Sequence, residues 1–161
     1  GAALKSRGLE PFLRDFLRDW LTLTLHGRAD EIPAMLARRR AEIAERRLPV
    51  AAFAKTEMLT DAPATYQRKR EAGGKSRQPA YEVALASGRE FRAGDAVAYY
   101  VAGLKKNVPV HAHAKLAAAF DPAHRDENVA YYLAKLDALA KKLDARSPET
   151  PEPEDDQPTL F

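Results

Sequence analysis

The stretch QPAYEVALASGREFRAGDAVAYYVAG, residues 78–103, carries the pattern that decides the fold. Gln78-Pro79 can open a short helix that Gly88 can end, because proline suits the first helical position and glycine tolerates the left-handed backbone of helix ends. Val97, Tyr99 and Val101 then alternate along the chain, which places them on one face of a β-strand. The stretch therefore predicts a short helix and then, within residues 89–114, one or two strands.

Helical patterns flank this stretch on both sides. Residues 9–25 place leucine, phenylalanine and tryptophan at three- and four-residue spacing opposite arginine and aspartate, as in an amphipathic helix. Gly27 can end that helix, and Asp30 can cap a second one over about residues 31–47, which Pro49 stops. Residues 120–145 are again helical in spacing, with Asp126 as the predicted N-cap. The predicted fold class is mainly α with a small β-hairpin insert (α+β).

Residues 50–77 lack the continuous helical spacing of the flanking segments. They combine a short apolar run, a turn at Ala62-Pro63 and a hinge at Gly73-Gly74. After residue 145 the chain has four prolines among acidic and small polar residues, so residues 146–161 are predicted to be a disordered acidic tail.

Charge is unevenly distributed along the chain. Residues 144–161 hold six acidic residues against Arg146 alone, a balance of −5, and because the whole chain is +3, residues 1–143 carry +8. The second predicted helix has five arginines opposite its apolar side: Arg38, Arg39, Arg40, Arg46 and Arg47. A basic body indicates a polyanionic partner, and the alternative is a solvated surface that happens to be rich in arginine.

Composition excludes several classes of protein. The chain has no cysteine, which excludes disulfides, thiolate zinc sites and cysteine nucleophiles. No apolar run is long enough to span a membrane, and the N-terminus lacks the pattern of a signal peptide. A cytoplasmic protein is expected, and Gly1, which is not an initiator methionine, is expected to be a cut or processed end.

No catalytic site is predicted. His111 and His113 could point to one side of a strand as metal ligands do, but no third ligand lies at a convincing spacing. Ser76 and Ser87 lack a paired histidine, and the glycines fit no phosphate-binding fingerprint. Neither catalytic nor metal-binding residues are therefore assigned.

The stretch TYQRKREAGGKSRQPAY, residues 65–81, is the strongest candidate for a binding site. Its basic residues and a tyrosine bracket a glycine pair, which suits phosphate contacts and close approach of the backbone: Tyr66, Arg68, Lys69, Arg70, Lys75 and Arg77. The alternative is a solvated loop with excess charge.

The order of segments resembles the thumb domain of family B DNA polymerases. The resemblance is carried by RGLEPFLRDFLRDWL (7–21), RRLPVAAFAKTEMLTDAPATYQ (46–67), residues 78–103 and FDPAHRDENVAYYLAKLDALAKKL (120–143). It implies a helical domain that closes over the primer–template duplex through phosphate and minor-groove contacts. Ala80 departs from the family, which often has histidine after the proline, and the basic insertion at residues 71–77 is non-standard.

This resemblance implies boundaries and roles. Residues 1–8 would end the palm, residues 9–145 would form the thumb, and residues 146–161 the tail. The resemblance implies no catalytic residue or cofactor in this chain, because the family's metal-binding carboxylates and their Mg²⁺ lie in the palm. The positions expected near DNA, by resemblance or as basic neighbours, are Lys55, Tyr66, Arg68, Lys69, Lys75, Arg77, Pro79, Arg92 and Gly94.

The end of the chain, DDQPTLF, resembles the pentapeptide by which bacterial replication proteins dock on the β sliding clamp. Gln157 would supply directional hydrogen bonds, and Leu160 and Phe161 would fill an apolar pocket. Pro158 departs from the preferred leucine at that position. Duplex DNA, the palm and the clamp are thus the expected partners, in the cytoplasm and on the nucleoid.

Two other functions fit the same residues. The chain could be a free-standing DNA-binding or clamp-associated accessory protein, such as one piece of a split polymerase. It could also be a helical protein-interaction module whose basic faces meet an acidic partner. Palm motifs encoded in frame before Gly1 would identify a polymerase, and the salt dependence of DNA binding separates the last two.

Overall fold

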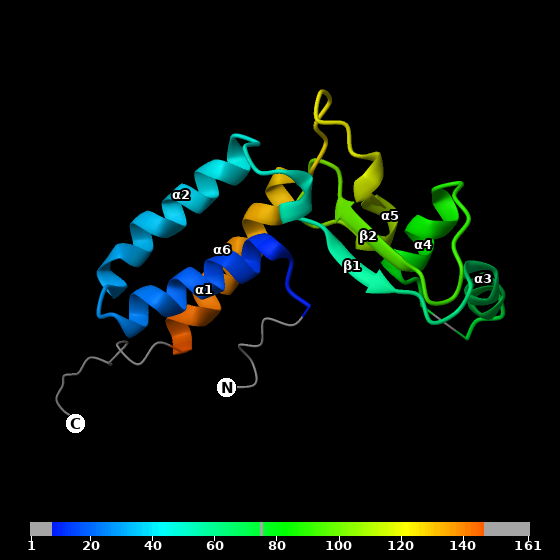
Figure 1. Cartoon of the computed structure of the whole chain (residues 1–161), viewed down its shortest axis with the longest axis horizontal. Helices are drawn as coiled ribbons and strands as arrows, with labels where there is room; N and C mark the ends of the chain where they lie inside the picture. Colours follow the sequence, from blue (N-terminus) through cyan, green and yellow to red (C-terminus); the bar gives the residue numbers. More distant parts are fainter. Residues whose placement is uncertain (1–7, 75, 147–161) are drawn as a thin grey trace.

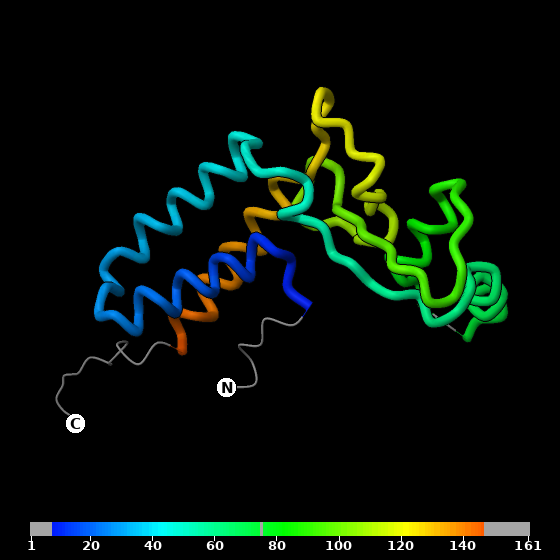
Figure 2. The backbone as a smooth tube through the Cα atoms, in the orientation of Figure 1, coloured from blue at the N-terminus to red at the C-terminus, as the bar shows by residue number. Residues whose placement is uncertain are grey.

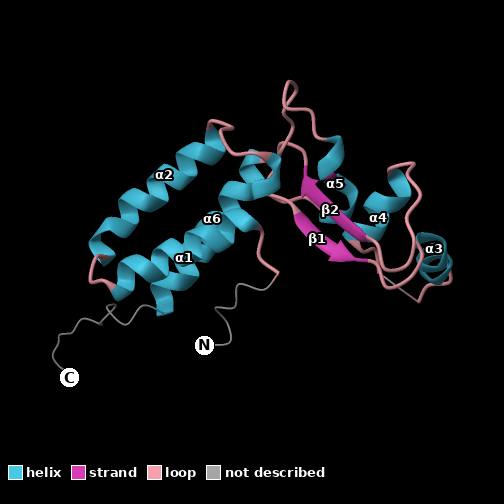
Figure 3. Cartoon of the chain, viewed as in Figure 1, coloured by secondary structure: helices cyan, strands magenta, loops and turns pink. Residues whose placement is uncertain are grey.

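A computed structural model describes residues 8–74 and 76–146. The predictions for Lys75, for the disordered tail and for Gln157, Leu160 and Phe161 therefore lie outside the described residues. The chain forms a helical lobe and a sheet lobe side by side (Figures 1 and 3). The helical lobe consists of α1 (Pro11–Leu25), α2 (Ile32–Ala44) and α6 (Val129–Arg146). The sheet lobe consists of β1 (Lys55–Met58), β2 (Ala96–Val101), β3 (Ala114–Leu116), α3 (Pro63–Glu71), α4 (Pro79–Ala86) and α5 (Val110–His113).

The predicted class, mainly α with a small antiparallel insert, is confirmed, although the insert is larger than predicted. It is a sheet of three strands in the order β1-β2-β3, with both pairs antiparallel. One sheet face packs its Val97, Tyr99 and Leu116 against α4. The opposite face is open at the β1 end, where Thr56 pairs with Ala98 and Met58, which is 70% exposed, pairs with Ala96.

Strand β2 joins two hydrophobic cores. Val97 and Tyr99 belong to the core of the sheet lobe, whereas Tyr100 and Val101 belong to the core of the helical lobe. In the helical core, Phe53 stacks on Tyr132 at 4.3 Å between ring centroids, and Phe12 meets both rings edge-on. Figure 2 shows the same arrangement as a chain path, in which the connection from α2 to β1, strand β2 and the segment before α6 run between the lobes.

Helices α1 and α2 end in the same hydrogen-bonded motif. In α1, Arg28 N–H donates to the Leu23 carbonyl (2.8 Å) and Gly27 takes a left-handed φ of 69°, as predicted. In α2, Arg47 N–H donates to the Glu42 carbonyl (2.9 Å), and the left-handed residue is Arg46 (φ 56°). A non-glycine residue in this conformation costs about 1–2 kcal/mol. This motif ends α2 at Ala44, three residues before the predicted end.

Two predicted N-caps are wrong. Asp30 lies within a 3-10 turn, Ala29–Glu31, and α2 begins directly after that turn with no side-chain cap. Helix α6 is capped by Asn128, whose Oδ1 accepts the N–H of Tyr131 (3.0 Å), and not by Asp126. Asp126 instead accepts hydrogen bonds from the Tyr100 hydroxyl (2.8 Å) and from Lys115 (2.7 Å).

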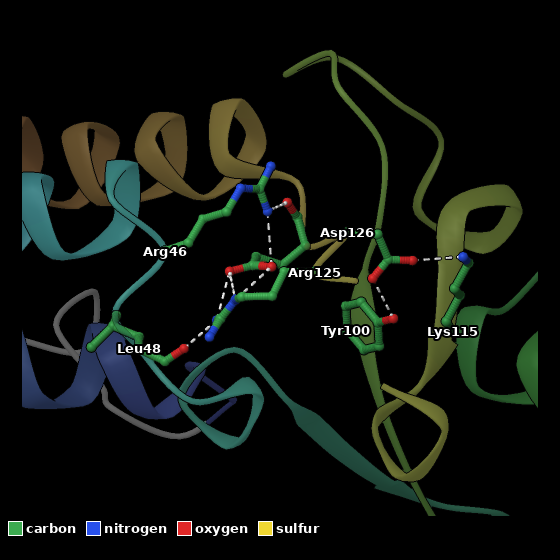
Figure 4. A network of polar contacts seen from close by, with 7 residues as sticks. Arg46, Leu48, Tyr100, Lys115, Arg125 and Asp126 are labelled. Atoms are coloured by element: carbon green, nitrogen blue, oxygen red, sulfur yellow. Dashed lines mark hydrogen bonds and ion pairs between the residues drawn. The ribbon is translucent and has the colours of Figure 1, made fainter. Parts of the chain in front are cut away.

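A buried glutamate joins the segment before α6 to the end of α2 and the connection that follows it (Figure 4). Glu127 is fully buried and accepts from Arg46 (2.9 Å) and from Arg125 (2.7 Å). Arg46 also donates to the Glu127 carbonyl (3.0 Å), and Arg125 donates to the carbonyl of Leu48. The segment before α6 is thereby held against the connection from α2 to β1.

Candidate nucleic-acid interface

Helix α3 is held in the sheet lobe by a pair of stacked tyrosines. The rings of Tyr66 and Tyr81 are nearly parallel (9°), with centroids 4.3 Å apart. The Tyr66 hydroxyl donates to Glu82 (2.6 Å) and accepts from the N–H of Gln78 (2.9 Å). Helix α3 is predominantly polar and buries only Tyr66. Its position therefore depends on this contact with α4.

The Tyr81 hydroxyl holds the turn that leads into α3. It accepts hydrogen bonds from the backbone N–H groups of Thr60 (3.0 Å) and Asp61 (2.9 Å). Burial alone would raise the pKa of Tyr81, but the hydrogen bond with the Thr60 hydroxyl (3.3 Å) and the two backbone hydrogen bonds outweigh burial and lower that pKa. The pKa of Tyr66 is raised by burial and by its hydrogen bond to Glu82. The Tyr81 hydroxyl thus acts mainly as an acceptor, whereas the Tyr66 hydroxyl donates to the carboxylate of Glu82.

The DNA contact predicted for Tyr66 does not agree with its position. The side chain is 1% exposed, and its hydroxyl is used within the lobe. Tyr66 therefore positions the neighbouring basic residues and cannot stack on a nucleotide in this conformation.

Removing the Tyr81 hydroxyl tests this arrangement. The change Tyr81→Phe is expected to lower the free energy of unfolding by about 1–2 kcal/mol, because two backbone N–H groups lose their acceptor. Urea unfolding would measure the difference. Thr56→Val, on the open face of the sheet, is the control and is expected to change stability by less than about 0.5 kcal/mol. Equal stability of Tyr81→Phe and the original chain would contradict the assigned role.

Several predicted DNA-binding cations are paired within the lobe. Lys69 forms an ion pair with Asp61 (3.1 Å), while Arg77 (3.4 Å) and Arg70 (3.3 Å) share Glu82. Lys69 and Arg77 remain about half exposed, so they can still face a phosphate. Their charge is nevertheless partly balanced by carboxylates that the sequence pattern did not connect to them.

Four cations of β1, α3 and the connection from α4 to β2 form no ion pair with described residues. Arg68 has only the hydroxyl of Thr65 within reach (3.4 Å). No ion pair is formed in the described part of the chain by Lys55, Arg89 or Arg92. These side chains are available to an anionic ligand, as are Lys105 and Lys106 of the loop after β2, which are exposed and form no ion pair with described residues. Sequence reasoning missed Arg89, Lys105 and Lys106.

The turn that carries Arg92 and Gly94 is rigidly placed. Arg92 N–H donates to the carboxylate of Asp95 (2.8 Å), and Gly94 adopts a left-handed φ of 91°. Gly94 N–H donates to the carbonyl of Leu59 (2.6 Å), and Leu59 N–H donates to the carbonyl of Asp95 (2.8 Å). The turn is thus fixed beside the segment that leads into α3.

A groove of about 670 Å³ lies where the two lobes meet. Its lining combines small side chains with Arg14, Lys55, Thr56 and Glu57, and the small residues are Gly8, Ala51, Ala54, Ala98, Ala117 and Ala118. Small side chains allow a bulky backbone to approach closely, and Lys55 supplies positive charge. Pro79, another predicted contact, starts α4 and lines a separate pocket between the lobes.

Three of the five arginines predicted for the basic face are structural, whereas Arg38 forms no ion pair with described residues and Arg47 pairs with the nearby Glu45. Arg39 pairs with Asp19 of α1, Arg40 pairs with Asp137 of α6, and Arg46 pairs with Glu127. Since these partners lie on other elements, the three ion pairs hold α2 in place and partly neutralise the predicted basic face.

The histidine pair lies on the single-turn helix α5, so it lacks the strand geometry that would point both rings to one side. Across residues 8–74 and 76–146, no group of three histidine, aspartate or glutamate side chains could hold a metal ion. Within the same residues, no helix is long and apolar enough to cross a membrane. Ser87 donates to the carbonyl of Ala84 (2.8 Å) at the end of α4, which is a structural use.

Comparison with known proteins identifies the fold. No family model matches the sequence, and no curated protein matches it. Among solved structures, the chain is similar to the family B DNA polymerase of the hyperthermophilic archaeon Pyrobaculum calidifontis, with a TM-score of 0.66 and 17% sequence identity. The match covers 92% of this chain and 19% of the polymerase. The chain therefore has the fold of a segment that makes up about a fifth of a family B DNA polymerase.

Proposed function

We propose that this chain is the thumb domain of a bacterial family B DNA polymerase and that it holds the primer–template duplex. The observation that carries the proposal is the similarity of fold over 92% of the chain to one segment of such a polymerase. The agreement in segment order between this chain and the family's thumb supports it independently. In this proposal residues 9–145 form the thumb, residues 1–8 join it to the palm, and residues 146–161 are the tail.

The proposed contacts are electrostatic and independent of base sequence. Arg68, Arg89 and Arg92 would face phosphates at the far end of the sheet lobe, and Lys55 would face phosphate in the groove between the lobes. Their lack of ion pairs with described residues supports this assignment, because no internal carboxylate has to be displaced. Lys69 and Arg77 would contribute more weakly, since they already face Asp61 and Glu82.

Catalysis belongs to other parts of the proposed enzyme. The Mg²⁺ ions of the parent polymerase are assigned to its palm, and no cofactor is assigned to this chain. The tail is proposed to tether the enzyme to the β sliding clamp through Gln157, Leu160 and Phe161. Such an enzyme would act in the cytoplasm, on the nucleoid.

The salt dependence of duplex binding tests the DNA contact. With about four phosphates neutralised, the logarithm of affinity is expected to fall with the logarithm of salt concentration at a slope of about −4. The pair Arg68→Ala and Arg92→Ala is expected to flatten the slope by about 2 and to weaken binding equally across sequences. Fluorescence anisotropy with unrelated duplexes would measure both quantities.

The pair Lys141→Ala and Lys142→Ala is the matched control. It removes two exposed charges from α6 in the helical lobe and is expected to leave the slope unchanged. An absence of duplex binding at low salt would overturn both DNA-binding interpretations and favour the protein-interaction module.

A further inference from the structure

The open end of the helical lobe contains an apolar groove. The groove has a volume of about 340 Å³ and lies between α1, the start of α2 and the end of α6. Its lining is mostly apolar and includes the single tryptophan of the chain: Phe16, Trp20, Ala29, Ile32, Pro33, Leu36, Ala140 and Asp144. Figure 1 shows the end of α6 beside the turn between α1 and α2. An apolar recess of this kind fits one or two bulky apolar side chains.

The chain itself supplies such side chains close to the groove. Asp144 and Ala140 line the groove, and Arg146 is the last residue of α6. Fifteen residues follow Arg146, and they end in Leu160 and Phe161. We infer that Leu160 and Phe161 dock in this groove of their own chain.

The length of the segment permits this docking. Fifteen residues span at most about 50 Å when extended. As a freely flexible chain the segment would have a root-mean-square length of about 20 Å, and its four prolines and five acidic residues make it more extended than that. A linker of this length gives an effective concentration of the order of 1 mM. A groove with a dissociation constant of about 1 mM would then be occupied about half the time.

Charge also favours docking at this end of the molecule. The segment carries five acidic residues at positions 149, 152, 154, 155 and 156, and no lysine or arginine. The end of α6 carries exposed Lys141, Lys142 and Arg146, which form no ion pair with described residues. These three positive charges therefore attract the acidic segment toward the end of α6, where the groove lies.

Docking would regulate access to the end of the chain. A partner that binds Leu160 and Phe161 must compete with the groove, so its apparent affinity falls in proportion to the fraction of undocked chain. At half occupancy the reduction is about twofold. The inference itself uses only the groove and the chain end, and it does not depend on the proposed sliding clamp.

The indole N–H of Trp20 gives one resonance that reports on the groove. In ¹H–¹⁵N spectra of the full chain, Leu160→Ala with Phe161→Ala is expected to shift this resonance. A peptide of residues 147–161 added to that variant is expected to move the resonance back, with saturation in the millimolar range. Circular dichroism of the variant, compared with that of the original chain, checks that the substitutions leave folding unchanged. An unchanged resonance in the variant would overturn the inference.

A blocked groove provides the second arm of the experiment. Ala29→Glu places a carboxylate in the groove, and in this background the Leu160→Ala and Phe161→Ala changes are expected to leave the Trp20 resonance where it is. Ala37→Glu makes the same change at an exposed position of α2 outside the groove, and in that background the shift is expected to persist. A persistent shift in the Ala29→Glu background would overturn the assignment of the groove. DNA binding by the Ala29→Glu chain would remain normal, which separates this test from that of the proposed function.

Discussion

Replacing Glu127 by alanine is expected to lower the free energy of unfolding by about 3 kcal/mol, the largest effect of any single side chain discussed above. Glu127 is fully buried and meets two guanidinium groups, from Arg46 and Arg125. Its removal leaves both cations without their carboxylate, and the segment before α6 is then held to the connection between α2 and β1 only by the bonds of Arg46 and Arg125 to backbone carbonyls. Arg46 and Arg125 are partly exposed, so water recovers some of the loss and keeps it near the lower end for buried pairs.

The backbone of Arg46 adds to the expected effect. Arg46 holds a left-handed conformation that costs a side-chain-bearing residue about 1–2 kcal/mol, and its bonds to Glu127 offset that cost. Arg46→Gly would relieve the backbone but lose the ion pair. We therefore expect it to be less destabilising than Arg46→Ala, which loses the ion pair and keeps the strain.

Thermal unfolding would measure the Glu127 effect. A loss of about 3 kcal/mol corresponds to a fall in melting temperature of about 6–12 °C for a chain of this size. Glu45→Gln is the matched control, because Glu45 also pairs with an arginine (Arg47, 2.9 Å) but is 61% exposed. Its expected effect is within about 0.5 kcal/mol. Similar losses for the two variants would show that burial of Glu127 does not matter.

Replacing Leu160 and Phe161 together by alanine is expected to reduce affinity for a β sliding clamp by more than about 100-fold. In peptide-in-groove binding, the buried apolar anchors supply most of the binding free energy. Duplex affinity should stay unchanged, because the proposed phosphate contacts lie in the sheet lobe. Surface plasmon resonance on immobilised clamp, with DNA binding measured in parallel, would show both results.

Single changes elsewhere in the tail sharpen this test. Thr159→Ala leaves the anchors in place and is expected to alter clamp affinity by less than about threefold. Pro158→Leu restores the residue that the resemblance implies as preferred, and it is expected to strengthen binding. Equal retention on the clamp by the doubly substituted chain would refute the tether while leaving the DNA proposal intact.

The elements with strong local signals were predicted well. Helix α1 was predicted from residue 9 and begins at Pro11, and α4 begins at Pro79 and is followed by Gly88 with a left-handed φ of 74°. Both helices have proline at the start and glycine after the end, so residues next to each end determine where the helix begins and stops. The N-cap of α6 also has a local signal, because Asn128 directly precedes the first helical residue. The sequence analysis nevertheless assigned the cap to Asp126.

Strand β1 lacks such signals, whereas helix α3 has Pro63 at its start and Gly73 with a left-handed φ of 82° after its end but no apolar face between them. Helix α3 buries one side chain, and β1 is an edge strand with three exposed residues of four. Each forms because of a partner distant in sequence: Tyr81 for α3 and β2 for β1. Without an apolar face, the local pattern was interpreted as a turn at Ala62-Pro63, a hinge at Gly73-Gly74 and a short apolar run, and helix α3 was missed.

The candidate site shows the same division. The sequence located the basic stretch and predicted that Arg68 and Arg92 lie near DNA. It could not show which cations are available to a ligand and which form ion pairs within the chain. That distinction depends on Asp61 and Glu82, which fold toward Lys69, Arg70 and Arg77. From the sequence, Tyr66 was as plausible a DNA contact as its basic neighbours, but in the structure it is buried and stacked on Tyr81.

The sequence by itself determined the helical class, the small antiparallel insert, the concentration of positive charge and the acidic end of the chain. Those features follow from periodicity, turn residues and composition, which act over a few residues. Only the tertiary structure decided which arginines bind to carboxylates of other elements and which remain available, and how one buried glutamate joins the segment before α6 to the end of α2. Ion pairs and buried contacts depend on distances between segments far apart in the chain, and those distances exist only after both cores have formed.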